Sequence, residues 1–213
     1  MRIILASNSP RRRELLAGLD LDFEVLVMKG IDESYPEGLG MRETAEYISY
    51  KKAEAYTLSE DELLITADTI VWLDGEVLGK PKDETDAVCM LRKLSGKTHQ
   101  VITGVTLRWN GSGETGSSTF SCVTDVTFAE LSDWQIKYYV QKYHPLDKAG
   151  AYGIQEWIGY VGVTGLKGSY YNVMGLPVQR LVEEMRKRGL VKDGRCTMYD
   201  GQCTMDDLKK YNI

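Results

Sequence analysis

The feature that most constrains this fold is a pair of long β-rich runs in the middle of the chain. The runs cover residues 99–108 and 117–128. Between them, the glycine-rich residues 110–116 have the composition of an exposed hairpin loop. The sequence therefore predicts long antiparallel strands in the middle of the fold.

Strand-like and helical patterns alternate on either side of this hairpin. Apolar runs predict further strands at residues 2–6, 23–28, 63–72 and 77–78. Capping residues and apolar periodicity predict a first helix from Pro10 and further helices at residues 42–58, 84–94, 132–142 and 177–188. Strands that alternate with helices, together with long hairpins, predict a mixed α/β fold.

Composition and charge exclude several function classes. The chain has 213 residues, 43% of them hydrophobic, which is enough for a sizeable core. A net charge of -5 argues against a protein that binds nucleic acid broadly, so any anion site must be local. No apolar stretch has the length of a signal peptide core or a membrane span, and we expect a cytoplasmic protein without a membrane partner. The cysteines, of which only Cys196 and Cys203 lie close in sequence, match neither a disulfide framework nor zinc spacing.

An arginine run at a helix start is the most informative oddity. Arg11, Arg12 and Arg13 fall in the first turn of the helix from Pro10, where the helix dipole and free N–H groups are already positive. A single arginine there is more simply solvated or paired with a carboxylate. Three arginines after the small polar side chains Ser7 and Ser9 instead predict a phosphate cradle.

Asp68 interrupts an otherwise apolar strand. A carboxylate in that setting has to be paired, metal-bound or functional to offset its desolvation. It could hold a metal or take a proton from water, or it could merely cap a loop at the strand end. Glu33, in the polar loop after residues 23–28, could supply a further metal oxygen or belong to a solvated acidic loop.

Four lysines are further candidates for an anion site. Lys51 and Lys52 lie on the second expected helix, and Lys148 lies in a later polar stretch. Lys80 is placed more predictably, because glycine and proline on its two sides fix a turn.

Two familiar types of catalytic centre find no support. Both histidines, His99 and His144, lack a ligand partner at useful spacing and are expected to be structural. The chain also has no Gly-x-x-x-x-Gly-Lys-Ser/Thr pattern, which disfavours a P-loop enzyme.

An ordered set of motifs resembles the Maf family over about residues 3–189. The motifs are Leu5-Ala-Ser-Asn-Ser-Pro-Arg-Arg-Arg-Glu-Leu-Leu16, Ala67-Asp-Thr-Ile-Val71, Gly79-Lys-Pro81, Ser95-Gly-Lys-Thr-His-Gln-Val101, Thr103-Gly104, Asp147-Lys-Ala-Gly-Ala-Tyr152, Ile154-Gln155 and Gly168-Ser-Tyr-Tyr-Asn-Val-Met-Gly-Leu-Pro177. The resemblance implies a two-lobed α/β fold with a central cleft, related to inosine triphosphatases. It also implies a nucleoside triphosphate pyrophosphatase that uses Mg²⁺ or Mn²⁺ and forms a homodimer.

The resemblance also implies roles for particular residues. Asp68 matches the family's proton acceptor, and Arg11, Thr69 and Gln155 match positions of the branch that prefers dTTP and UTP. The Gln155 amide could pair with the O4 and N3–H edge of thymine or uracil. Phosphates are then expected on Ser7, Ser9, Arg11, Arg12, Lys51, Lys52 and Lys80, and the metal on Glu33 and Asp68.

Two rival functions stay open at this point. One is a pyrophosphatase for 7-methyl-GTP or another modified nucleotide, and the other is a nucleotide-sensing protein of cell-division control without catalysis. The chain departs from the family pattern at Arg13 and after Lys192. We therefore expect one catalytic domain over residues 1–191 and an appendage over residues 192–213.

Overall fold

The computed structural model describes residues 1–111 and 114–191. In that part of the chain, seven strands form one mixed sheet in the order β2-β1-β3-β5-β6-β7, with β4 paired to β3 as well. The strands are β1 (Arg2–Leu5), β2 (Phe23–Val25), β3 (Glu62–Leu73), β4 (Glu76–Leu78), β5 (Thr98–Gly111), β6 (Glu114–Phe128) and β7 (Val163–Lys167). β1 runs parallel to β2 and β3, and the remaining pairs are antiparallel.

Helices flank this sheet, so the predicted mixed α/β class is confirmed. They are α1 (Pro10–Ala17), α2 (Met41–Glu54), α3 (Glu84–Leu94), α4 (Asp133–Tyr143), the 3₁₀ turn η1 (Ala149–Ala151), α5 (Trp157–Gly162), α6 (Tyr170–Met174) and α7 (Val178–Lys187). None of these helices is long and apolar enough to cross a membrane.

Local capping chemistry explains where several helices begin. The Ser9 side chain accepts from the Arg12 N–H, and Pro10 occupies the first turn of α1, as predicted. Asp83 caps α3 in the same way. Ser132 and Gln135 form a reciprocal capping box at α4. The sequence signals for these three starts are therefore confirmed.

Residues up to Leu181 form one compact unit, and a second unit begins at Val182. In the described part of the second unit, Lys187 pairs with Glu183 one turn earlier, at 2.7 Å. The appendage expected from Lys192 onward lies outside the described residues.

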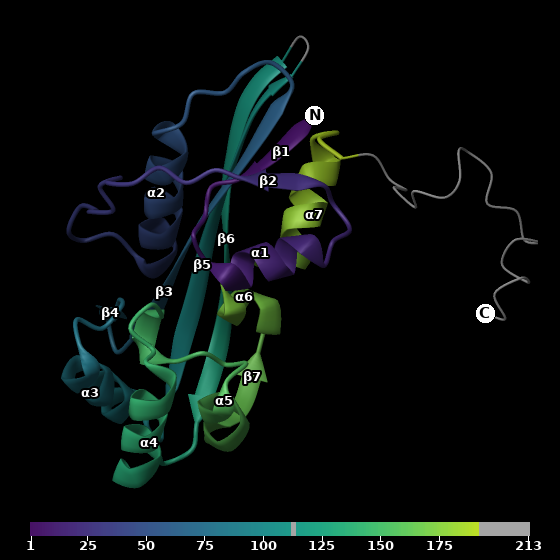
Figure 1. Cartoon of the computed structure of the whole chain (residues 1–213). Coiled ribbons are helices and arrows are strands. Elements are labelled where there is room, and N and C mark those ends of the chain that lie inside the picture. Colours follow the sequence, from purple (N-terminus) through teal and green to yellow (C-terminus); the bar gives the residue numbers. More distant parts are fainter. Residues whose placement is uncertain (112–113, 192–213) are drawn as a thin grey trace, which may run out of the picture. The chain divides into compact units, whose positions relative to one another are not determined.

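The long hairpin of β5 and β6 joins β3 to form the middle of the first unit (Figure 1). α2 covers one face, where Ala45 and Ile48 pack with Ile70 and Ile102. α6 lies on the opposite face, and the Asn172 carbonyl accepts from Thr103 Oγ. A separate and larger apolar cluster joins α3, α4 and α5 to the far ends of β5 and β6. The described core residues of the unit therefore fall into separate apolar clusters along the sheet.

The edge of β3 is left open between its two neighbours on one side. β1 pairs with β3 only as far as Ile65, and β4 pairs with β3 only from Val71 onward. Among the described residues, no strand pairs with residues 66–70 on that side. Asp68 and Thr69 lie in this gap and alternate between the two faces of the sheet. The end of β1 opens into the same gap, as ligand crevices do at the carboxyl ends of parallel strands.

Residues 157–174 differ most from the sequence expectation. They form α5, β7 and α6, three short elements that the sequence patterns did not predict. α5 has six residues and α6 has five, too few for apolar periodicity to appear. The strand expected at residues 23–28 ends at Val25, after pairing with the last residue of β1.

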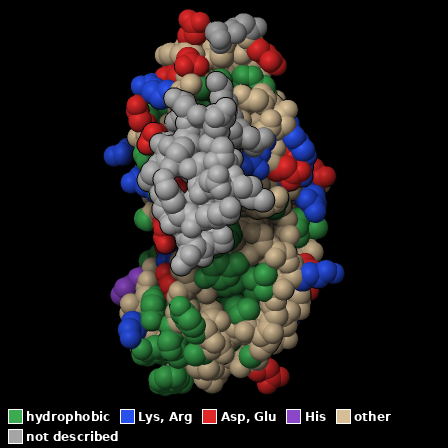
Figure 2. All heavy atoms as spheres, turned by 90° about the vertical axis from the view of Figure 1, so that its right-hand side faces the viewer, with side chains coloured by type: hydrophobic (Ala, Val, Ile, Leu, Met, Phe, Trp, Pro, Cys, Tyr) green, Lys and Arg blue, Asp and Glu red, His purple; other side chains and the backbone are tan. Residues whose placement is uncertain are grey.

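Hydrophobic side chains gather on one outer face of the first unit. Figure 2 shows them in the lower half of the face that carries α5, β7 and α6. Exposed large hydrophobic residues of these elements are Tyr160, Val161, Leu166, Tyr170 and Tyr171. An exposed patch of this kind is typical of an interaction surface.

Candidate active site

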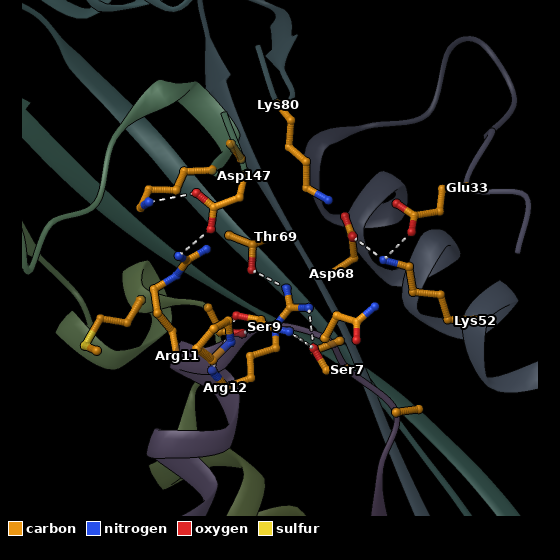
Figure 3. Close-up of a pocket in the computed structure, with 18 of the residues that line it drawn as sticks. Ser7, Ser9, Arg11, Arg12, Glu33, Lys52, Asp68, Thr69, Lys80 and Asp147 are labelled. Carbon is orange, nitrogen blue, oxygen red and sulfur yellow. Dashed lines mark hydrogen bonds and ion pairs between the residues drawn. The ribbon is translucent and has the colours of Figure 1, made fainter. Parts of the chain in front are cut away.

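A cavity of about 550 Å³ opens at the gap in the edge of β3. That volume is in the range of pockets that take small molecules. Its lining brings together the end of β1, the start of α1, the loop after β2, β3 and the segment around η1. Figure 3 shows basic side chains reaching into it from several sides.

The loop after β1 shapes one wall of the cavity. Ser7 Oγ accepts from the Ser9 N–H at 3.2 Å, which tightens the turn, and Ser9 then caps α1. No acidic residue lies in the first turn of α1. The N–H groups and the positive dipole end of this helix therefore face the cavity without an anionic partner from their own helix.

Arg12 ties three elements together beneath this wall. Its Nε donates to the Gly175 carbonyl at 2.8 Å, and its terminal nitrogens donate to Thr69 Oγ1 at 3.1 Å and Ser7 Oγ at 3.4 Å. Burial lowers the pKa of the Arg12 guanidinium, and Asp68 partly opposes that effect. Arg12 therefore serves mainly to hold the cradle together and contributes its charge from behind.

Arg11 has a single carboxylate partner across the cavity. Its Nη1 lies 2.9 Å from Asp147 Oδ2, and Lys148 Nζ lies 2.7 Å from Asp147 Oδ1. Burial raises the pKa of Asp147, but hydrogen bonds from Lys148 and Arg11 outweigh it, so the pKa lies below its usual value. Asp147 is therefore an anion that two cations share.

Lys52 joins the two carboxylates expected to act in the site. Its Nζ lies 2.7 Å from Asp68 Oδ1 and 3.1 Å from Glu33 Oε1. The Asp68 side chain is 14% exposed and the Glu33 side chain 51%, so one carboxylate is enclosed and the other faces solvent. Two carboxylates therefore converge on one cationic point.

Lys80 and Gln155 complete the set of expected residues at the cavity. Figure 3 shows the Lys80 side chain pointing toward Asp68. The turn of Lys80 is fixed by the Gly79 carbonyl, which accepts from the Gly150 N–H at 3.0 Å. Gln155 also lines the cavity, and its buried Oε1 has no hydrogen-bond partner among the described protein atoms. A buried amide oxygen without a partner is costly unless a ligand donor reaches it.

His99 stands behind the cavity and supports its wall. Its Nε2 lies 2.7 Å from the hydroxyl of Tyr152, which lines the cavity, and its ring meets Phe128 edge to face. Burial lowers the pKa of His99 to about 4, so the ring is neutral at pH 7. This placement agrees with the structural role expected for His99.

The lowered pKa of His99 predicts an acid-sensitive fold. In the unfolded chain this histidine becomes protonated below about pH 6.5, whereas in the folded chain it stays neutral down to about pH 4. The free energy of unfolding therefore falls as pH decreases between these values. The expected slope is at most about 1.4 kcal/mol per pH unit. Denaturant unfolding between pH 7 and pH 4 should show a shallower slope for His99→Gln. His144→Gln, at an exposed histidine, is the control, and equal slopes in all three proteins would contradict the assignment.

Comparison with known proteins identifies the family. The family model described as Maf-like protein matches residues 2–188. The chain belongs to the Maf family. Two similar relatives are both named dTTP/UTP pyrophosphatase. The one from Phocaeicola vulgatus is 62% identical over 188 residues, covering 87% of this chain and 95% of the relative. The one from Bacteroides thetaiotaomicron is 56% identical over 191 residues, with the same coverage.

A solved structure is similar at a lower level. It is a nucleoside-triphosphatase / dITP/XTP pyrophosphatase from Mycobacterium abscessus, with 15% identity and a TM-score of 0.41, covering 89% of this chain and 97% of that one.

The cavity of this Maf protein contains all but one of the expected site residues. The residues that line it are Ser7, Ser9, Arg11, Arg12, Glu33, Lys52, Asp68, Thr69, Lys80 and Gln155. Lys51 is the exception, because it is not among the lining residues and its Nζ lies over the Tyr47 ring at 5.9 Å from the centroid. Arg13, where the chain departs from the Maf pattern, is exposed outside the lining.

Several lining residues of the Maf cavity were not expected from the sequence. They are Val27, Met28, Lys29, Ile31, Tyr56, Asp147 and Tyr152. Lys148, one of the four lysines considered for an anion site, lines the cavity as well. Tyr56 accepts from the Met28 N–H at 2.9 Å and donates to the Leu26 carbonyl at 3.2 Å, which fixes the loop after β2. Nothing in the local sequence distinguishes this tyrosine from others on the second helix. The pair of Asp147 and Lys148 lies in a quoted motif, which is the signal that could have found it.

Proposed function

We propose that this Maf protein hydrolyses dTTP and UTP to the monophosphate and pyrophosphate. The observation that carries the proposal is a cavity lined by cationic side chains and the N-terminus of α1 together with Gln155, whose Oε1 has no hydrogen-bond partner among the described protein atoms. The N3–H of thymine or uracil is a donor for that oxygen, and the neighbouring O4 accepts from the amide nitrogen. The names of the similar relatives support the same substrates.

The triphosphate binds at the cradle of α1 in this proposal. Ser7, Ser9 and the N-terminus of α1 offer donors, and Arg11 and Lys80 offer positive charges at the cavity wall. Arg12 stays bonded to Gly175 and Thr69 and keeps the cradle in place. These groups stabilise charge that spreads over the phosphate oxygens as pyrophosphate leaves.

Asp68 acts on the attacking water. Lys52 engages Asp68 Oδ1, so we assign the proton of the water to Oδ2. The water oxygen bonds to the α-phosphorus, and the bond from that phosphorus to the bridging oxygen breaks. Pyrophosphate leaves with the electron pair of that bond. The ion pair with Lys52 holds the Asp68 carboxylate in place.

The residues present fit a divalent cation. Glu33 and Asp68 converge on the same side of the cavity, where both pair with Lys52, and carboxylate oxygens suit Mg²⁺ or Mn²⁺. The described residues contain no group of three or more His, Cys, Asp or Glu side chains suited to a metal, so substrate phosphates would complete the coordination. A bound divalent cation would neutralise phosphate charge and polarise the phosphoryl group.

Pyrophosphate release from a nucleotide panel tests the proposed function. The panel holds dTTP, UTP, CTP, GTP, 7-methyl-GTP and ITP, each with Mg²⁺, with Mn²⁺ and with chelator. We expect metal-dependent release led by dTTP and UTP. Release led by 7-methyl-GTP would show that the enzyme acts on modified purine nucleotides instead. Nucleotide binding without release would identify a sensor instead of an enzyme.

Replacing Gln155 with leucine is expected to lower kcat/KM for dTTP by about 10- to 100-fold, because up to two hydrogen bonds to the base are lost. The preference for dTTP over CTP should fall with it. Cytosine presents N3 as an acceptor and N4–H as a donor, so CTP pairs with this amide only if the amide turns by 180° from the orientation that suits thymine. Steady-state kinetics with both substrates measures this, and an unchanged preference would remove Gln155 from base recognition.

Three wider properties belong to the same proposal. We assign residues 1–191 to the catalytic domain and place the protein in the cytoplasm. We also assign a homodimer, which is supported by the exposed hydrophobic side chains of α5, β7 and α6.

A further inference from the structure

The segment 147–156 carries two groups of the proposed site at its two ends. Asp147 pairs with Arg11 at one end, and Gln155 faces the cavity at the other. Between them, Gly150 has φ 67° and Ala151 has φ 59°. A left-handed alanine is unfavourable by about 1–2 kcal/mol. Contacts elsewhere in the segment must therefore hold this backbone.

Glu156 is the junction of those contacts. Its Oε2 accepts from the Tyr139 hydroxyl, and its Oε1 lies 3.2 Å from Lys148 Nζ. The same hydroxyl accepts from the Gly153 N–H at 3.0 Å. Lys148 Nζ also pairs with Asp147 Oδ1, and Asp147 Oδ2 pairs with Arg11 Nη1. A chain of alternating donors and acceptors thus runs from α4, through both ends of the segment, to α1.

The contacts among Tyr139, Glu156 and Lys148 are enclosed, which restricts how these side chains can move. Tyr139 is fully buried, the Lys148 side chain is 9% exposed and the Glu156 side chain 20%. Burial, followed by the bond to Glu156, raises the pKa of Tyr139, so its hydroxyl remains a donor at any working pH. Neither Tyr139 nor Glu156 lines the cavity.

Gly153 links Glu156 to the amide of Gln155. A Cβ at Gly153 would lie 2.9 Å from Glu156 Cδ and 3.1 Å from Gln155 Nε2. The two side chains therefore share the space above this glycine. Loss of the bonds that hold Glu156 would free both the Gly153 backbone and the Glu156 side chain, which lies beside the Gln155 amide over this glycine.

We infer that Glu156, held by Tyr139 and Lys148, is a positioning residue that fixes the Gln155 amide for base selection. The inference rests on the proposed function of the same cavity. Tyr139 acts through Glu156 and the Gly153 N–H, and neither residue touches the substrate. If Glu156 has this role, loss of its contacts should raise KM and lower base selectivity. The value of kcat should be largely kept, because the groups around Asp68 stay in place.

Tyr139→Phe removes the hydroxyl and keeps the ring. We expect KM for dTTP to rise about 5- to 30-fold, the equivalent of one or two lost hydrogen bonds, and the preference for dTTP over CTP to fall by a similar factor. Glu156→Gln, which keeps an acceptor and loses the charge, should change both in the same direction by less. Glu156→Gln also tests the inference if Tyr139→Phe does not fold. Tyr143→Phe, whose ring stacks on Tyr139 at 5.1 Å, is the matched control.

A double-mutant cycle separates this role from a structural one. In a Gln155→Leu background, Tyr139→Phe should no longer change the preference for dTTP over CTP, because the amide that it positions is gone. Fully additive effects would overturn the inference, as would an unchanged KM and preference in both single variants. If the wild-type protein releases no pyrophosphate from pyrimidine triphosphates, the proposed function is wrong, and the inference is wrong with it. The two failures are thus distinguishable.

Discussion

Asp68→Asn is expected to lower kcat for dTTP by about 10²- to 10⁴-fold, the range for loss of a positioned general base. Asparagine keeps the size of the side chain and can still accept from Lys52 at the position of Oδ1. It cannot take the proton of the attacking water, and it is a poorer ligand for a divalent cation. Stopped pyrophosphate assays at saturating dTTP measure the loss, and KM should change far less.

The control for this variant is Asp125→Asn. Asp125 lies on β6, accepts from Gln100 Nε2 at 3.1 Å and does not line the cavity. The same chemical change there should leave kcat within a factor of about two. Near wild-type turnover in Asp68→Asn would remove Asp68 as the base and move the role to another group at the cavity.

Gly104→Ala is expected to destabilise the fold by about 3 kcal/mol, the upper part of the range for overpacked sites. Gly104 lies on β5 where the α2 backbone crosses the sheet. A Cβ there would lie 2.2 Å from the Ala45 carbonyl oxygen and 2.7 Å from the Glu46 nitrogen. These are backbone atoms of a helix, so the whole of α2 must shift. Denaturant unfolding gives the free energy of unfolding directly.

Gly165→Ala is the matched control, because it adds the same atom to a glycine on another strand. A Cβ at Gly165 would lie 3.5 Å from Thr127 Cβ, which is ordinary contact. Its effect should stay within about 0.5 kcal/mol. Because α2 also carries Lys52, Gly104→Ala should reduce pyrophosphate release even where it remains folded. Equal unfolding energies for the two variants would contradict the close approach of α2.

Signals that lie within a few residues predicted much of the site. Ser9 and Pro10 mark the start of α1 whatever lies around them, since capping uses only nearby backbone groups. Asp68 was identified because a carboxylate inside an apolar strand needs a reason. The hairpin of β5 and β6 was similarly clear from its length and its glycine-rich turn.

The choice between Lys51 and Lys52 shows where sequence reasoning stopped. Both were expected at the phosphates, and only Lys52 lines the cavity. The buried residues Ala45, Ile48 and Ser49 define the inner stripe of α2, and Lys52 continues that stripe at helical spacing. Lys51 is one residue out of phase and faces away. The helical periodicity of the buried residues therefore distinguishes the two lysines from the sequence alone.

The contacts of Glu156 could not be predicted from the sequence. Tyr139, Lys148 and Glu156 are distributed over α4, the turn before η1 and the start of α5, and only tertiary packing brings them together. α5 and α6 were missed for a related reason. Helices of one or two turns form because of what they pack against, and their intrinsic preference is too weak to read.

The hydrogen bond between the Gly150 N–H and the Gly79 carbonyl places different constraints on the side chains that positions 79 and 150 can carry. It joins the turn of Lys80 to η1, and it uses main-chain atoms alone. Exchange of a side chain at position 79 leaves the bond intact, since nothing lies within 4 Å of a Cβ added there. At position 150 a Cβ would meet Val71 at 2.8 Å. A side chain at position 79 is therefore sterically tolerated in this chain, whereas at position 150 the contact with Val71 and the positive φ both favour glycine.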